Sequence, residues 1–110
     1  MPIKSQIGLK EMISQKEKML NEGKVLRTSE KGNSMIPLIM SGQEHELTPV
    51  KGWEECEVDD IVYCKVHGRY FTHLVKAKDP LKGLQISNNK GFINGWTKSV
   101  FAKVTKVFNK

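Results

Sequence analysis

A serine within an unusual turn sequence is the first residue of this chain whose setting suggests chemistry. Ser34 lies in the run Gly32-Asn33-Ser34-Met35-Ile36-Pro37-Leu38, and Gly42 closes the segment. Pro37 opposes a helix here, and the run does not alternate as a strand does. The glycine and asparagine before Ser34 permit a tight bend that could hold the hydroxyl in one direction, as a nucleophile requires. An ordinary Gly-Asn-Ser turn explains the same residues, since loops of this composition are common.

The second candidate is His73, which lies far from Ser34 in the sequence. A serine hydroxyl is a weak nucleophile until a base within hydrogen-bond reach removes its proton. Histidine has a pKa near 6.5 and is the usual base at neutral pH, where it typically contributes ~10²–10⁴ in rate. The two residue types therefore predict attack on a carbonyl group, but any chain of this size contains a serine and a histidine. The order of the segments around them carries the information.

Short strands separated by turns are predicted to position these two side chains. Apolar alternation between Gly, Asn and Pro turns indicates strands over 24–28, 47–50, 61–66, 69–76, 84–87 and 100–108, with a further short segment over 92–96. His67-Gly68 has the form of a tight turn between two of them. In the strand that follows, His73 shares a face with Phe71 and Val75. The pattern predicts a mainly β fold, a curled and mostly antiparallel sheet.

A single helix is predicted ahead of this sheet, over residues 5–22. Its apolar residues recur at three- and four-residue steps, Ser5 can cap its start and Gly23 can end it. The stripe could pack on the sheet of the same chain or dock another protein. No second helix precedes the β-region, so a DNA-binding helix-turn-helix is not predicted. The expected organisation is an N-terminal amphipathic helix over 1–23 and a β-domain over 24–110.

Composition restricts the function classes. A chain of 110 residues has room for one domain, and no apolar run approaches the ~20 residues of a membrane span. No signal-peptide block is present, so we expect a soluble protein of the cytoplasm. The net charge of +6 is spread through the chain, which is more typical of solvated lysines than of a nucleic-acid site. Cys56 and Cys64 do not form a zinc motif and are expected to be reduced, so neither a metal nor a cofactor is predicted.

The ordered segments resemble the S24/S26 serine-peptidase clan, which includes type I signal peptidases and LexA-type self-cleaving repressors. The resemblance runs from about Gly32 to Phe108. Residues 32–37 are similar to the nucleophile box of the clan, and Asp60-Ile61-Val62 to the pair that opens its hairpin. His73 falls where the second catalytic residue sits, which is histidine in the archaeal and endoplasmic-reticulum type. The segment from Asn88 to Trp96 is most similar to short soluble members from phage genomes.

This resemblance implies a LexA/signal-peptidase-like β-domain and a role for each residue of the box. Ser34 would attack a peptide carbonyl, with His73 as base and then acid. The backbone N–H of Ser34 would help to hold the oxyanion, and Gly32, Asn33, Met35 and Pro37 would shape the turn and cleft. Histidine-type members place an acid near the turn at Asn88, where this chain has amides. Asn88 or Asp60 could orient His73, with Asp79 as a further candidate.

Two functions follow from this pattern. The first is a serine endopeptidase that cleaves a peptide or protein in trans with a Ser34/His73 dyad. Repressor-style self-cleavage does not fit, because no Ala-Gly or Cys-Gly pair precedes Ser34. The alternative is a weak or inactive peptidase fold that binds a host protein as an inhibitor or regulatory module. A basic nucleic-acid binder is the weakest hypothesis, and the sequence does not indicate an oligomeric state.

Overall fold

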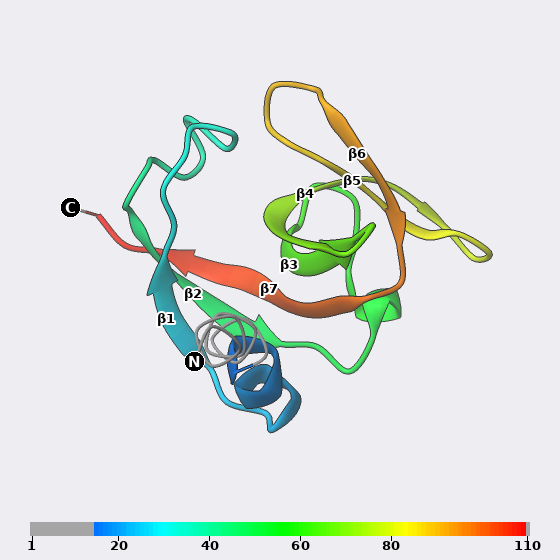
Figure 1. Ribbon diagram of the computed structural model, residues 1–110, viewed down its shortest axis with the longest axis horizontal. Helices are drawn as coiled ribbons and strands as arrows, with labels where there is room; N and C mark the ends of the chain where they lie inside the picture. The colour runs from blue at the N-terminus through cyan, green and yellow to red at the C-terminus, as the bar shows by residue number, and fades with distance from the viewer. Residues whose placement is uncertain (1–14, 110) are drawn as a thin grey trace, which may run out of the picture.

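The chain folds into one seven-stranded antiparallel sheet, as the computed structural model shows for residues 15–109 (Figure 1). The strands are β1 (Leu26–Ser29), β2 (Glu44–Pro49), β3 (Ile61–Val66), β4 (Arg69–Asp79), β5 (Gly83–Ser87), β6 (Ile93–Thr97) and β7 (Val100–Val107), with a 3₁₀ turn η1 (Trp53–Glu55) before β3. Their order in the sheet is β1-β2-β7-β3-β4-β5-β6, so β1 and β6 form its two edges. The sheet curls without closing into a barrel. The predicted mainly β fold is confirmed.

The hairpin between β3 and β4 is the centre of the sheet and carries His73. His67 and Gly68 both have positive φ, 49° and 81°, and this two-residue turn sets the register of the hairpin. Val66 pairs with Arg69 at the turn, and Val62 pairs with His73 further along. The boundaries of β3 agree with the sequence-based prediction. β4 is longer than predicted and continues to Asp79, because its second half pairs with β5.

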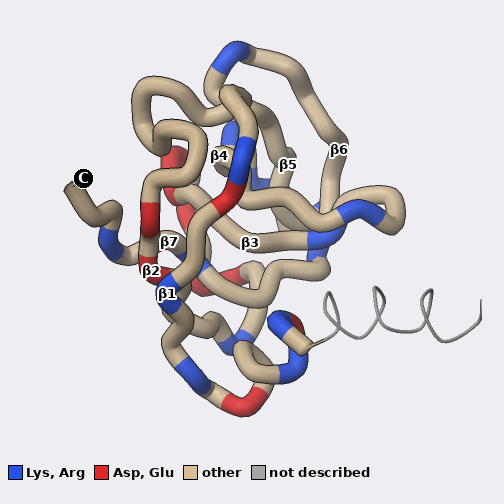
Figure 2. Tube along the Cα trace, turned by 60° about the vertical axis from the view of Figure 1, so that its left-hand side comes forward, with Lys and Arg blue, Asp and Glu red and all other residues tan. Residues whose placement is uncertain are grey.

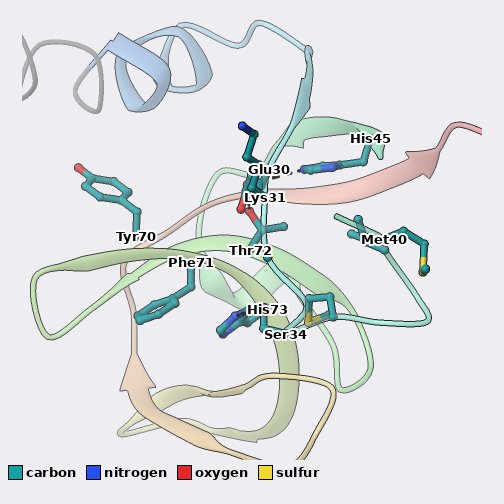
Figure 3. A pocket seen from close by; sticks show the side chains of 12 residues that line it. Glu30, Lys31, Ser34, Met40, His45, Tyr70, Phe71, Thr72 and His73 are labelled. Carbon is teal, nitrogen blue, oxygen red and sulfur yellow. Dashed lines mark hydrogen bonds and ion pairs between the residues drawn. The ribbon is translucent and has the colours of Figure 1, made fainter. Parts of the chain in front are cut away.

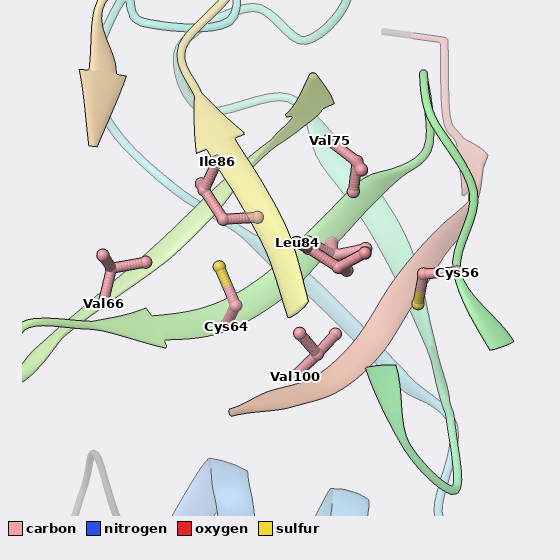
Figure 4. Close-up of a cluster of buried hydrophobic side chains, with 8 residues drawn as sticks. Cys56, Cys64, Val66, Val75, Leu84, Ile86 and Val100 are labelled. Atoms are coloured by element: carbon pink, nitrogen blue, oxygen red, sulfur yellow. The ribbon is translucent and has the colours of Figure 1, made fainter. Parts of the chain in front are cut away.

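The two faces of the sheet bury separate apolar clusters. One cluster fills the concave side of the curled sheet and includes both cysteines (Figure 4). Its fully buried members are Cys56, Val62, Cys64, Val75, Leu84 and Ile86. Burial raises the pKa of the Cys56 thiol to about 11 and that of the Cys64 thiol to about 12. Both cysteines are free and act as small apolar core residues.

The described part of the N-terminal helix, residues 15–21, packs against the opposite face. Leu20 is buried there with Leu47, Tyr63 and Ala102. Its neighbour Glu17 accepts a hydrogen bond from the Tyr70 hydroxyl at 3.3 Å. This part of the helix therefore covers the sheet of its own chain. The remainder of the predicted helix, including Leu9, Met12 and Ile13, lies outside the described residues.

Acidic residues gather in and just after η1, at Glu54, Glu55, Glu57, Asp59 and Asp60, whereas basic residues are spread along the chain. Figure 2 shows Lys and Arg positions on every side of the view. Within residues 15–109 no helix is long and apolar enough to cross a membrane.

Candidate active site

The turn that carries Ser34 is anchored to the sheet by two apolar side chains. Met35 and Ile39 are buried and pack with Leu74 of β4. The Ile39 N–H donates to the Met35 carbonyl at 3.1 Å, so this part of the segment coils through one turn. Burying an apolar side chain of this size contributes about 1.5–3 kcal/mol, which is enough to hold a short loop in place. Ser34 therefore begins a docked turn.

Asn89, in the turn between β5 and β6, fixes the same segment from the other side. Its backbone N–H donates to the Ser34 carbonyl at 2.8 Å, and its side-chain amide donates to the Ile36 carbonyl at 2.9 Å. The two ends of the segment are joined, because the Gly42 N–H donates to the Glu30 carbonyl at 2.8 Å. Gly42 thus closes the segment, as its place in the sequence indicated. Two hydrogen bonds from one asparagine set the position of the serine backbone.

His73 lies within hydrogen-bond distance of Ser34. The distance between His73 Nε2 and Ser34 Oγ is 3.1 Å (Figure 3). The imidazole is only 8 % exposed and stacks on the Phe71 ring, with 4.9 Å between the ring centroids. Ser34 itself is half-buried. The two candidates from the sequence are therefore brought together from a docked turn and a central strand.

Asn94 of β6 holds the other nitrogen of this imidazole. Asn94 Oδ1 lies 2.7 Å from His73 Nδ1. An amide oxygen only accepts hydrogen bonds, so Nδ1 carries the proton and Nε2 presents a lone pair to the serine hydroxyl. This is the tautomer in which His73 can take the proton of Ser34. The three side chains form a Ser–His–Asn arrangement.

Burial decides the charge of His73. Desolvation lowers the pKa of His73 below its usual 6.5, while the Asn94 hydrogen bond and the charge of Glu30 oppose this shift in part. The imidazole is thus neutral at pH 7. A neutral base in contact with a serine hydroxyl is the resting state that acyl transfer requires.

The other residues proposed to orient His73 make their hydrogen bonds within turns and loops of the chain. Asn88 Oδ1 accepts the backbone N–H groups of Lys90 and Phe92 and so closes the β5–β6 turn. Asp60 accepts the Glu57 N–H at 2.8 Å and lies 3.7 Å from the Lys103 ammonium. Asp79 accepts the N–H groups of Leu81 and Lys82 in the β4–β5 turn. The amide beside His73 belongs to Asn94, six residues after the expected Asn88.

The residues expected to shape the turn occupy it in different ways. Gly32 has a φ of 130°, and its N–H donates to the Ser41 hydroxyl at 3.0 Å. The Asn33 carbonyl accepts the Ile36 N–H at 3.4 Å. The Ile36-Pro37 peptide bond is cis, and Pro37 is exposed. Met35 points inward and anchors the turn, as described above.

A pocket of about 340 Å³ opens beside the Ser34–His73 pair. Its lining comes from the segment after β1, from the Ser34 turn, from β2 and from β4 (Figure 3). Four successive residues of β4, Tyr70 to His73, belong to this lining. Side chains alternate between the faces of a strand, so a pocket that touches four in a row runs along the strand's edge. The pocket therefore follows the edge of β4.

That edge of β4 has open backbone groups. β5 pairs with β4 only from Leu74 onward, whereas β3 pairs with it from Arg69. The Lys65 N–H donates to Ser99 on the β7 side, so the partner of Lys65 in β4, Tyr70, directs its backbone groups away from β3. The same holds for Thr72, two residues on. No described strand pairs with this edge, which can accept an extended peptide.

Comparisons with known proteins add no assignment. No protein-family model matches the chain, and no curated protein matches its sequence.

Proposed function

We propose that this chain is a small serine peptidase, related to the S24/S26 clan, that cleaves a peptide or protein substrate in trans. The observation that carries the proposal is the 3.1 Å contact between Ser34 Oγ and the unprotonated Nε2 of His73. Asn94 supports it by keeping the proton on Nδ1. The clan relationship rests on the order of the sequence segments and on a β-sheet that brings them together.

The chemistry would proceed in two stages. Ser34 Oγ attacks the peptide carbonyl carbon while its proton moves to His73 Nε2, and the imidazolium then protonates the departing amine. Water next attacks the ester on Ser34 and gives a proton to the same Nε2, and the imidazolium returns that proton to Ser34 Oγ as the C–O bond breaks and the acid product leaves. The Ser34 backbone N–H is the proposed oxyanion donor, a contact of a kind worth about 2.7–4 kcal/mol in known proteases.

The substrate would bind as an added strand along the open edge of β4. The outward backbone groups of Tyr70 and Thr72 would pair with its main chain, and the pocket would receive one of its side chains. Such pairing places a carbonyl beside Ser34 without requiring a particular sequence. This explains why the pocket extends past the catalytic pair along the strand.

The proposal is tested with a mixed peptide library and a serine-directed probe. Wild type is expected to cleave some of the peptides and to be labelled, and Ser34→Ala to do neither. Ser99→Ala is a matched control, since Ser99 is exposed, immediately precedes β7 and lies outside the pocket. Equal behaviour of wild type and Ser34→Ala in both assays would reject the proposal.

The alternative is a binding module that keeps the peptidase fold. The observation that favours it is Asn94, because an amide stabilises an imidazolium less than a carboxylate does. The same open edge and pocket would then hold a peptide segment of a partner without cleaving it. Ser34→Ala would bind that segment as tightly as wild type, and wild type would release no product.

A further inference from the structure

A carboxylate stands at the other end of the pocket from the catalytic pair. Glu30 follows β1, and its Oε1 accepts a hydrogen bond from Thr72 Oγ1. Its backbone carbonyl is also fixed by the Gly42 N–H. The side chain is nevertheless 41 % exposed and lines the pocket. Glu30 is therefore a positioned negative charge with room for a partner.

Behind Glu30 lies a buried histidine with an unpartnered nitrogen. His45 of β2 is 1 % exposed, and its Nδ1 lies 3.5 Å from the Gln43 carbonyl, to which it can only donate. Its Nε2 therefore presents a lone pair and has no hydrogen-bond partner among the described residues. This nitrogen lies 3.8 Å from Glu30 Oε1. Burial lowers the pKa of His45, so the ring is neutral at pH 7.

Two hydrogen-bond acceptors thus face each other at this end of the pocket. The neutral imidazole does not balance the charge of the Glu30 carboxylate, and neither group can donate a hydrogen bond to the other. A cationic hydrogen-bond donor would supply both the charge and the proton that this carboxylate lacks. Lys16 of the helix already shows that an ammonium is tolerated here, since its Nζ lies 3.6 Å from Glu30 Oε1. That distance is beyond a hydrogen bond, so the acceptor capacity of the carboxylate remains. The ammonium of Lys31 points away from Ser34 and His73 in Figure 3.

The remaining wall of the pocket is suited to a long aliphatic stem. Met35, Ile39 and Met40 line this wall, and all three belong to the segment that carries Ser34 and leads to β2. Lysine and arginine carry three or four methylene groups that pack on such surfaces while their charged ends reach a polar group. A volume of about 340 Å³ has room for one side chain of that length.

We propose that Glu30 is a specificity residue and that the site selects peptides with lysine or arginine next to the scissile bond. The cation would bind the Glu30 carboxylate, with its stem along the methionine and isoleucine side chains. Thr72 would hold the carboxylate in position. This inference rests on the proposed peptidase function for its cleavage readout, but selection of a basic peptide can be measured without cleavage.

The test compares peptides that differ only at that residue, as lysine or as the uncharged, equally long norleucine. Wild type is expected to favour lysine by about tenfold in kcat/KM, and Glu30→Gln to bring the ratio close to one. Lys16→Gln is expected to raise the ratio, because it removes a competing cation. Glu54→Gln, an exposed glutamate outside the pocket, is the control that keeps the wild-type ratio.

The charge of Glu30 partly opposes the lowering of the His73 pKa, so Glu30→Gln can change the cleavage rate of every substrate. The ratio removes this common effect. If Glu30→Gln fails to fold, the rise in Lys16→Gln and a fall of the wild-type ratio with salt still decide the question. A lysine preference that is unchanged in Glu30→Gln, or in Lys16→Gln and high salt, overturns the inference.

Binding separates this inference from the peptidase proposal. The same peptides are titrated into Ser34→Ala and into Ser34→Ala with Glu30→Gln. A lysine preference that depends on Glu30, without cleavage by wild type, supports the inference and rejects the peptidase. Cleavage by wild type without a preference in either assay keeps the peptidase and rejects the inference. Absence of both cleavage and preferential binding rejects both.

Discussion

His73 and His45 lie at two ends of one pocket and differ mainly in what their Nε2 atoms meet. Both rings are buried, and burial lowers the pKa of each. In both, the Nδ1 proton is directed at an oxygen, the Asn94 amide for His73 and the Gln43 carbonyl for His45. The Nε2 of His73 meets a hydroxyl that can give up a proton, whereas the Nε2 of His45 faces a carboxylate. The same tautomer would therefore serve the proposed base at one end and the proposed charge-dependent binding site at the other.

The largest expected effect breaks the catalytic end. His73→Gln keeps a polar side chain but removes the base, so kcat is expected to fall on the order of 10⁴-fold. His67→Gln, in the exposed turn between β3 and β4, is the matched control and is expected to retain activity. Steady-state hydrolysis of a peptide found in the library measures both. A loss shared by the two variants would mean that the hairpin, and not the base, had been damaged.

A smaller effect sharpens the role of the oxygen at Nδ1. Wild-type kcat/KM is expected to stay level through neutral pH and to fall only below 6.5, because the lowered pKa keeps His73 neutral. Asn94→Asp places a carboxylate beside Nδ1 and favours the imidazolium, so the acid limb should move up by about one unit or more. Asn88→Asp is the control, since Asn88 serves the β5–β6 turn. A shift in the control but not in Asn94→Asp would restore the sequence-based assignment.

The smallest effect concerns the stability of the binding end. His45→Leu replaces a buried ring by an apolar side chain, so the free energy of unfolding at pH 7 should change by less than about 1 kcal/mol. In wild type the unfolded chain binds a proton at His45 near pH 6.5, and the folded chain binds it only at lower pH. Stability should therefore fall as the pH drops below 6.5, and His45→Leu should reduce that fall.

Urea denaturation at pH 7 and pH 5 measures both quantities. A loss of several kcal/mol at pH 7 would show that Nε2 of His45 has a stabilising partner, and the comparison between the two rings would fail.

Much of the fold was predictable because turn chemistry and alternation are local. The His67-Gly68 turn determined where β3 ends and β4 begins, and the face shared by Phe71, His73 and Val75 followed from strand geometry. The contact between Ser34 and His73 could be expected only from the order of the segments. Its distance depends on the docking of Met35 and Ile39, which involves the whole sheet.

Asn94 was missed for a physical reason. Three asparagines, Asn88, Asn89 and Asn94, lie within a few residues, and the sequence does not indicate which one faces His73. In the pairing of β5 with β6, Ile86 lies opposite Gly95 and Ser87 opposite Ile93, so Asn94 is an extra residue in β6. Such a bulge redirects a side chain, and the sequence does not predict its position. The Glu30, His45 and Thr72 group was missed because its members come from three separate segments and form no motif.

The β5–β6 hairpin supplies both Asn89, which holds the Ser34 turn, and Asn94, which orients His73. Any local opening of this edge hairpin would release the nucleophile and the base together, so the site should assemble and come apart as one unit. The Asn89 amide proton is held in its hydrogen bond to the Ser34 carbonyl only while that unit is closed. Its exchange rate with solvent would therefore report the fraction of molecules in which the Ser34–His73 pair is assembled.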